Sequence, residues 1–410
     1  MDVLMIISIL VALCASFSYI NVKFLKLPSA IGLMLISLIF SLLIMAESKI
    51  SNTFYHQIEA MVKSINFSQT LLNILLGFLL FAGSLHINLS ELKKQRAAVI
   101  SFSTLSVALS IFFFGGIMWW MFTLFNSPVD FIYCLWFGSL VSPTDPIAVI
   151  GIFKKSNMPK GIEATINGES LFNDGIGIVF FVTIGQVINL GIENLSFMDV
   201  LLLFGREVIG GFTLGFLLGY GANYFMQKID HYQTEVLISL ALVMVCGEIA
   251  HLLHVSGPLA VIVIGLILGS KISKSATSEI TRDYHSKFWE LIDEFLNAIL
   301  FVLIGLQMVL LPFLTNYLLI GVIAIILLLI CRYISLSIPI FFLKDKKLFN
   351  SRTALIMTWG GLRGGLSIAL TLSLPDNPYK EIMVSITYII VLFSILIQGL
   401  TTGRLVEIFY

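Results

Sequence analysis

The stretch Gly138-Ser-Leu-Val-Ser-Pro-Thr-Asp-Pro-Ile-Ala148 interrupts an apolar segment, 130–152, that is long enough to cross a lipid bilayer. Pro143 and Pro146 each remove a backbone hydrogen-bond donor and clash with the preceding turn, so a continuous helix is not expected there. Asp145 adds a charge between the two prolines. Interrupted backbone at membrane depth is tolerated only where protein or a water-filled cavity surrounds it. The sequence therefore predicts a broken transmembrane helix that lines a buried polar site.

A second interruption, Trp359-Gly-Gly-Leu-Arg-Gly-Gly-Leu-Ser367, lies within the apolar segment 352–374. Glycine disfavours a helix interior, and four glycines flank Arg363 there: Gly360, Gly361, Gly364 and Gly365. When segment 199–227 is taken as a linker, each interruption falls in the fifth of six predicted spans, and the two halves have opposite orientation. Interrupted helices at matching positions of inverted repeats indicate the substrate site of a secondary transporter.

The composition of the 410-residue chain argues against a soluble globular protein. Apolar residues make up 58% of the chain and charged residues 12%, about half of what soluble proteins carry. The 24 basic and 24 acidic residues balance, so there is no positive excess that would bind nucleic acid. Four cysteines lie in apolar stretches without the spacing of a zinc site or a disulfide framework: Cys14, Cys134, Cys246 and Cys331. We therefore expect an all-α polytopic membrane protein.

Thirteen segments approach the roughly 20 apolar residues that a membrane-spanning helix needs. They are 3–21, 28–46, 69–87, 98–125, 130–152, 163–190, 199–227, 234–252, 255–270, 291–311, 316–343, 352–374 and 382–403. Most connections between them are short, except 47–68 and 271–290. We expect most of the second connection, from Lys271 to Lys287, to be a solvated cytoplasmic loop.

The basic residues predict the orientation of these spans. With the N-terminus outside, 18 Lys and Arg fall in or beside the inner loops and three in the outer loops, while Arg206, Arg332 and Arg363 lie within spans. Such a bias marks the cytoplasmic side of a membrane protein. The start of the chain lacks the basic region of a cleaved signal peptide, so the first helix is expected to remain. We expect a multi-pass protein of the cell membrane, plasma or inner, with a cytoplasmic C-terminus.

Ionisable side chains inside spans are unfavourable by a few kcal/mol each and are functional by default. The predicted spans hold a set of five near their interruptions: Asp145, Glu169, Asp174, Arg332 and Arg363. Because an arginine does not lose its proton in a protein, two carboxylates are expected to stay charged and match the two arginines. The third carboxylate can then carry either a proton or a cation.

The segment Gly168-Glu-Ser-Leu-Phe-Asn-Asp-Gly175 arranges polar residues at helical spacing. Ser170 and Asp174 share one face, and Glu169 and Asn173 share the neighbouring stripe. The alternative for each carboxylate is a buried ion pair with an arginine, and for Glu169 this structural pairing is the favoured interpretation. Spacing alone leaves its partner open between the two arginines.

Four motifs in order along nearly the whole chain resemble the NhaP/NHE branch of the monovalent cation:proton antiporters. They are Ser142-Pro-Thr-Asp-Pro146, Gly168–Gly175, Phe288-Trp-Glu-Leu-Ile-Asp-Glu-Phe-Leu-Asn297 and Gly360-Gly-Leu-Arg-Gly-Gly365. The resemblance implies a thirteen-helix, NhaA-like inverted repeat in which the fifth and twelfth helices are broken and cross. It also implies a homodimer, with a dimerisation domain from 1–97 and 191–315, the second part including the linker helix, and a transport core from 98–190 and 316–410. The end of the chain soon after the last span resembles the shorter microbial type.

The resemblance also assigns roles to residues of this sequence. It implies that Asp145, Ser170, Asp174 and the backbone carbonyl of Thr144 bind the transported cation, which is cargo and not a fixed metal. Glu169 would form a buried bridge with Arg332, steadied by Asn173, and Arg363 would offset the carbonyl ends of the broken helices. The Asn173-Asp174 pair, where electrogenic relatives have two aspartates, implies electroneutral exchange of one cation per proton.

The expected function is therefore secondary antiport of Na⁺ or Li⁺ against H⁺, which serves sodium transport and pH regulation. Two carboxylates in a low-dielectric site raise one another's proton affinity, so cation and proton compete for one site as access alternates. No cofactor is expected, since the chain lacks a GxxxxGK[ST] phosphate loop, and membrane lipid is the expected surrounding partner. The alternatives are a K⁺/H⁺ antiporter of the same fold and, more remotely, a non-transporting membrane sensor or an intramembrane aspartyl protease. Such proteases have a Gly-x-Gly-Asp motif that Asn173-Asp174 does not match.

Overall fold

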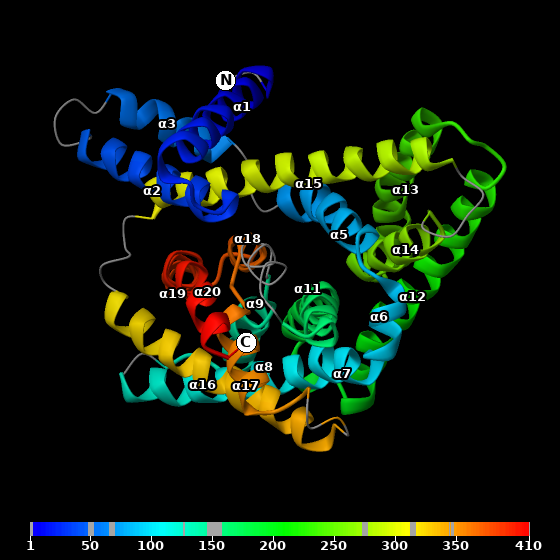
Figure 1. The fold of residues 1–410 in the computed structure, drawn as a ribbon. Coiled ribbons are helices and arrows are strands. Elements are labelled where there is room, and N and C mark those ends of the chain that lie inside the picture. The colour runs from blue at the N-terminus through cyan, green and yellow to red at the C-terminus, as the bar shows by residue number, and fades with distance from the viewer. Residues whose placement is uncertain are drawn as a thin grey trace.

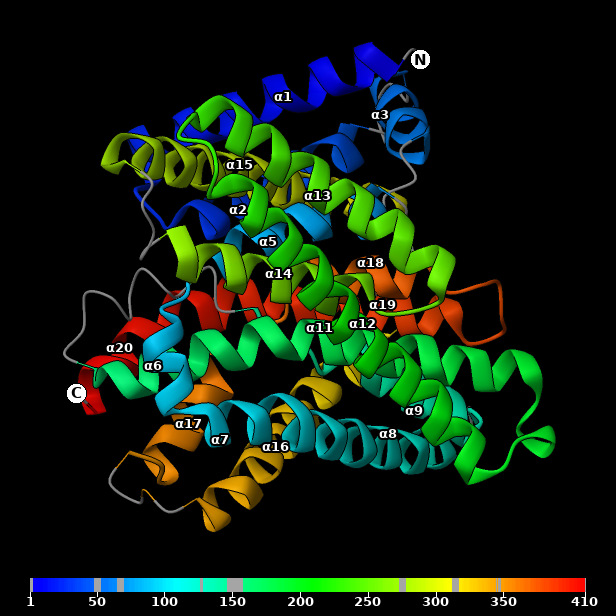
Figure 2. The same cartoon turned by 90° about the vertical axis from the view of Figure 1, so that its right-hand side faces the viewer.

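The computed structural model describes residues 3–47, 53–64, 70–125, 128–145, 158–272, 278–311, 317–343, 345 and 348–409. Within these ranges the regular structure is helical and contains no β-strand. The helices form two groups that lie side by side, and part of the long helix α15 (Glu279–Gln307) lies at the boundary between them (Figure 1). The view turned by 90° separates the same two groups (Figure 2).

We call the first group the scaffold group. Its helices come from the start and the middle of the chain: α1 (Val3–Ile20), α2 (Ser29–Glu47), α3 (Thr53–Ser64), α5 (Leu76–Leu85), α12 (Phe197–Met226), α13 (Tyr232–Leu253), α14 (Gly257–Ile272) and α15 (Glu279–Gln307). Within it, α14 packs between α12 and α5, and α15 packs on α2. The short helix α6 (Leu89–Lys94) leads from this group to the next.

We call the second group the core group. It combines α7 (Arg96–Ile100), α8 (Val107–Leu124), α9 (Phe131–Val141) and α11 (Lys160–Leu190) with α16 (Leu318–Phe342), α17 (Ser351–Gly360), α18 (Gly365–Leu372), α19 (Lys380–Phe393) and α20 (Gly399–Phe409). Wider π-type turns occupy Asn21–Leu25, Leu71–Leu75, Ser101–Ser106 and Ser394–Gln398, and short 3₁₀ turns occupy Ile192–Asn194 and Met308–Leu310. Chain segments about 200 residues apart thus meet in one bundle, with α16 packed against α8 and α9 against α18.

The described residues contain nine helices that are long and apolar enough to span a membrane. The described residues reach up to ten spans if the pair α17 and α18 counts as one, and this pair is bent by 58° where the helix stops after Gly360 and resumes at Gly365. Three shorter apolar helices, Leu76–Leu85, Phe131–Val141 and Gly257–Ser270, coincide with the third, fifth and ninth predicted spans. The protein is therefore a multi-pass membrane protein, and the count of thirteen spans stays a prediction.

One prediction about the connections is wrong. Residues 279–287 are not a solvated loop, because α15 already begins at Glu279. The side chain of Ser278 caps this helix by accepting a hydrogen bond from the Thr281 backbone N–H at 3.3 Å. His285 and Trp289 are then buried: the Trp289 ring N–H donates to the Ser239 hydroxyl at 3.0 Å, and His285 Nε2 lies 3.2 Å from the same hydroxyl. Hydropathy missed these turns because only one face of the helix is buried.

Glycines allow the closest helix contacts inside the scaffold group. A Cβ atom on Gly215 of α12 would lie 2.5 Å from the carbonyl oxygen of Ala260 on α14. A Cβ on Gly269 of α14 would overlap the carbonyl of Leu85 on α5. Small residues at such positions are how membrane helices approach closely, because lipid provides no hydrophobic force between them.

The boundary between the two groups has a different character. Glycines of the core group face aliphatic side chains of the scaffold group: Gly175 contacts Leu259, and Gly365 contacts Leu300. A hydrogen bond also crosses the boundary, from the buried Tyr388 hydroxyl of α19 to the Ile304 carbonyl of α15 at 2.6 Å. These contacts between the two groups are thus mainly apolar, with one hydrogen bond among them.

Candidate functional site

The two sequence interruptions meet in the core group. α9 ends at Val141, and the chain from Ser142 to Asp145 is not helical, as expected where Pro143 prevents the helix from continuing. The Asp145 backbone N–H donates a hydrogen bond to the Leu362 carbonyl at 2.8 Å. A backbone donor of one interruption therefore forms a hydrogen bond with a backbone acceptor of the other. Such pairing is needed inside a membrane protein, where water is scarce.

Arg363 holds both interruptions together. Its Nε donates to the Val141 carbonyl at 2.6 Å, and its Nη1 donates to the Gly361 carbonyl at the same distance. Both acceptors lie at helix ends, where carbonyls have no partner in the helix and the helix dipole is negative. The guanidinium is 97% buried, so these two hydrogen bonds fix its position.

Glycines allow a close approach where Asp145 meets the second interruption. A Cβ on Gly364 would lie 3.1 Å from the Asp145 carboxylate, and a Cβ on Gly361 would lie 3.1 Å from the Thr144 methyl group. Gly360 closes α17 and Gly365 opens α18. The glycines thus keep room for the Asp145 side chain beside the chain break. Pro146 lies outside the described residues.

The last helical segment adds residues that the sequence analysis missed. The Ser394 hydroxyl accepts the Arg363 backbone N–H at 2.8 Å and donates to Gln398 Oε1 at 2.6 Å. Gln398 in turn donates to the Trp359 carbonyl at 3.1 Å. These two side chains thus form hydrogen bonds with backbone groups at the end of α17 that have no partner within the helix. The available signal was their polarity within an apolar span, which is weak because serine is common in transmembrane helices.

Glu169 and Arg332 form a buried ion pair between α11 and α16. Arg332 Nη2 lies 2.6 Å from Glu169 Oε1, and both residues are at most 2% exposed. Asn173, one turn further along α11, donates from Nδ2 to the same carboxylate oxygen at 2.8 Å. The structure thus pairs Glu169 with Arg332, a choice that spacing could not make. Other Arg332 nitrogens, Nε and Nη1, are buried without a hydrogen-bond partner in the described part of the chain.

Thr144 connects the first interruption to α11. Its carbonyl accepts the Ser170 hydroxyl at 2.7 Å, and its own hydroxyl accepts Asn173 Nδ2 at 2.6 Å and Arg332 Nη2 at 3.3 Å. Its backbone N–H donates to Asn173 Oδ1 at 3.3 Å. The Thr144 side chain was not among the predicted site residues. Because Thr144 belongs to the chain break and its hydroxyl contacts Asn173 and Arg332, it holds the break at a fixed position relative to the ion pair.

Asp174 differs from these engaged groups. It lies on α11 five residues beyond Glu169, is partly exposed, and within the described ranges accepts no hydrogen bond. Asp145 and Glu169 both act on its carboxylate electrostatically. Like charges this close favour binding of a proton or a cation between them. Carboxylate, carbonyl and hydroxyl oxygens are the ligands that hard monovalent cations prefer, so Asp174 and Asp145 remain candidates for a cation site.

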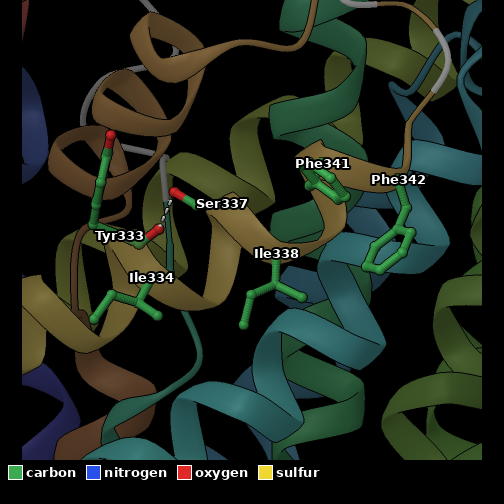
Figure 3. A pocket seen from close by; sticks show the side chains of 6 residues that line it. All are labelled: Tyr333, Ile334, Ser337, Ile338, Phe341 and Phe342. Carbon is green, nitrogen blue, oxygen red and sulfur yellow. Dashed lines mark hydrogen bonds between the residues drawn. The ribbon is translucent and has the colours of Figure 1, made fainter.

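A cavity of about 320 Å³ lies elsewhere, along the outer face of α16. Figure 3 shows its six lining residues, all from this one helix: Tyr333, Ile334, Ser337, Ile338, Phe341 and Phe342. No lining side chain is charged, and the Ser337 hydroxyl already donates to the Tyr333 carbonyl. Large exposed apolar side chains on a spanning helix face lipid. This cavity is therefore not the cation site.

A membrane-spanning helical fold in which two chain interruptions meet around buried carboxylates and arginines defines the class of secondary transporters. Comparison with known proteins narrows the class. The sequence model of the family described as "Sodium/hydrogen exchanger, transmembrane" matches residues 9–408. The chain therefore belongs to the sodium/hydrogen exchanger family, whose members are transporters rather than enzymes.

Individual relatives agree with this assignment. The chain is 43% identical to the Na⁺/H⁺ antiporter NhaP of Pseudomonas aeruginosa, a match that covers 99% of this chain and 96% of that relative. It is 31% identical to the Na⁺/H⁺ antiporter NhaH of Halobacillus dabanensis, with 98% and 97% covered. The solved structure of the sodium proton antiporter MjNhaP1 from Methanocaldococcus jannaschii at pH 8 matches with a TM-score of 0.78, 20% identity and 99% coverage of both chains. The last match supports the fold.

Proposed function

We propose that the protein exchanges Na⁺ or Li⁺ for H⁺ across the cell membrane, one cation per proton. Cation and proton compete for one site formed by Asp145 and Asp174, with the Ser170 hydroxyl and the Thr144 carbonyl as further oxygen ligands. The observation that carries the proposal is the unengaged Asp174 carboxylate beside Asp145, on the same helix as a Glu169 carboxylate that Arg332 and Asn173 hold. The antiporter names of relatives that cover almost the whole chain support the substrates.

The charge balance of the site supports the one-to-one ratio. Three carboxylates, Asp145, Glu169 and Asp174, face two arginines, Arg332 and Arg363, so the empty site carries one negative charge in excess. Either one Na⁺ or one proton neutralises it. Moving an uncompensated charge through the membrane is strongly unfavourable, so the core moves readily only when the site is loaded. Both directions of movement then carry the same charge, and exchange is electroneutral.

The alternating movement belongs to the two helix groups. We assign the transport core to 98–190 and 316–410, and the dimerisation domain with the linker helix to 1–97 and 191–315, with two copies joined as a homodimer. The apolar boundary of glycines against aliphatic side chains supports relative movement of the groups. The N-terminus lies outside and the C-terminus in the cytoplasm, as the distribution of Lys and Arg favours.

Reconstitution of the purified protein in liposomes tests the proposal. After a proton gradient is imposed, Na⁺ or Li⁺ added outside should change internal pH, whereas K⁺ should have little effect. Clamping the membrane potential at zero with valinomycin and equal K⁺ should leave the initial Na⁺-driven rate nearly unchanged. A response to K⁺ alone would replace the proposed substrate, and a Na⁺-driven current that reverses at another stoichiometry would refute one-to-one exchange.

A further inference from the structure

A buried stripe of α15 carries one charge. Residues four positions apart lie on one face of a helix, and the stripe that faces inward runs through Thr281, His285, Trp289, Asp293 and Asn297. The other four members are buried, whereas Asp293 is half-buried. Ionisable residues at such depth in a spanning helix are rare without a function. The ion pair and hydrogen bonds of the core site do not use this carboxylate.

Asn297 lies one turn beyond Asp293 and is only partly engaged. Its Nδ2 donates to Asp293 Oδ1 at 3.1 Å. Its carbonyl oxygen, Oδ1, is buried and has no hydrogen-bond partner in the described part of the chain, although the residue is only 8% exposed. Buried polar atoms are almost always partnered, so an unsatisfied acceptor beside a carboxylate indicates a ligand that brings positive charge. Together the two side chains present oxygen atoms that form no ion pair with a basic residue of the described ranges.

The stripe points toward the first interruption of the core group. Asp145 is close enough to act electrostatically on the Asp293 carboxylate, more strongly than the exposed neighbours Glu290 and Glu294. Leu300, three residues beyond Asn297, packs against Gly365, the residue next to the glycine that contacts Asp145. Asp293 and Asn297 therefore face the candidate cation site from the scaffold side of the boundary.

We propose that Asp293 and Asn297 form a second oxygen site for the transported monovalent cation, on the scaffold group, where the ion stops before it reaches Asp145 and Asp174. This inference rests on the proposed function. Carboxylate and amide oxygens replace part of the hydration shell, as oxygen ligands do in ion pathways. A cation between Asp293 and Asp145 also offsets the repulsion of the two carboxylates. Because the site stays with the scaffold when the core moves, it serves loading and release rather than translocation.

Neutralising Asp293 tests this site. In proteoliposomes, Asp293→Asn should raise the apparent KM for Na⁺ roughly threefold or more, because a unit charge near the path is lost. The maximal rate at saturating Na⁺ should stay near that of the wild type, since Asp145 and Asp174 remain. The comparison is made at a pH well above the midpoint of activity. There, proton competition no longer hides a change in cation binding.

Matched variants separate a ligand from a general effect of negative charge. Glu290→Gln and Glu294→Gln remove exposed carboxylates on the same helix and should leave the KM unchanged. Asp293→Glu keeps the charge and should keep most of the affinity, and Asn297→Leu, which removes the free oxygen, should raise the KM less than Asp293→Asn. Thermal stability of each variant in detergent identifies those that fail to fold.

The outcomes distinguish this inference from the proposed function. If the wild type exchanges Na⁺ for H⁺ while folded Asp293→Asn has the wild-type KM, or if Glu290→Gln raises the KM equally, the scaffold site is wrong and the proposed function stands. If the wild type shows no cation-driven proton movement, the proposed function itself fails. A raised KM in both Asp293→Asn and Asn297→Leu, with unchanged maximal rates, supports the site.

Discussion

Glu169 and Asp174 are carboxylates on the same helix, five residues apart, yet their surroundings are opposite. Glu169 is 2% exposed and accepts hydrogen bonds from Asn173 and Arg332. Asp174 is partly exposed, and in the described part of the chain it accepts none. A carboxylate held by a buried arginine is a fixed part of the structure, whereas an unengaged one stays available to a proton or cation. Both hydrogen bonding and burial therefore distinguish Asp174, the proposed transport carboxylate, from the structural Glu169.

The largest effect is expected at Asp174. Asp174→Asn removes both the group that takes up a proton and the charge that binds the cation, so exchange should be abolished. Its melting temperature in detergent should equal or exceed that of the wild type, because an unengaged carboxylate next to other acids stabilises nothing. Dequenching at the wild-type rate in everted vesicles would overturn the comparison.

Asp145 should follow with a large effect on affinity. Asp145→Asn keeps the size of the side chain but removes one of the two charges around the ion. We expect the apparent KM for Na⁺ to rise about tenfold or more, which corresponds to about 1.4 kcal/mol of binding free energy. A KM equal to that of the wild type would show that Asp145 is a structural residue like Glu169.

The Glu169–Arg332 pair should affect stability more than transport affinity. Removing either partner leaves a buried charge without its counterion, which destabilises a protein by roughly 3–5 kcal/mol. Glu169→Ala and Arg332→Ala should therefore each lower the melting temperature in detergent strongly. The double variant should recover part of this loss because no single charge is left behind. A double variant as unstable as the sum of the single variants would contradict the pairing.

Asp230 provides the smallest expected effect, at a carboxylate outside the membrane spans. Hydrogen bonds from Thr281 and Ser278 lower the pKa of this exposed carboxyl below its ordinary value. A lowered pKa means stability that is present above the unfolded-state pKa and is lost as the pH falls through the folded-state value. Asp230→Ala should lower the melting temperature slightly at neutral pH. The difference from the wild type should shrink under acidic conditions, and a difference that grows there would contradict the assignment.

Much of the fold could be predicted because its signals are local. Apolar length located most spans, and the glycines around Arg363 located the stop after Gly360 and the restart at Gly365. The start of α15 could not be located in this way. The residues from Glu279 onward are largely polar, as in a loop. Their buried face becomes apparent only in the structure, where His285 and Trp289 contact Ser239 of another helix.

The charged residues of the candidate site could be selected from the sequence, but their pairings could not. Glu169 and Arg332 are 163 positions apart, and no local pattern relates two residues at that separation. The role of Ser394 as acceptor for the Arg363 backbone depends equally on how the last helical segment packs. Asp293 belongs to the motif that carried the family resemblance, but the motif alone does not indicate a function for it. The proposed role depends on the unsatisfied oxygen of the neighbouring Asn297, which only the structure shows.

The boundary of glycines against leucines has a mechanical consequence. Dispersion contacts between smooth apolar surfaces change little when one surface slides, whereas a hydrogen bond weakens steeply once its angle opens. Gly175 against Leu259 and Gly365 against Leu300 make only dispersion contacts, and there is no room for a larger side chain, since a Cβ on either glycine would lie 2.5 Å from a leucine Cδ atom. The Tyr388–Ile304 hydrogen bond is a directional contact at this boundary. It would have to break if α19 moved against α15. The movement proposed for the exchange would therefore break few directional contacts at this boundary.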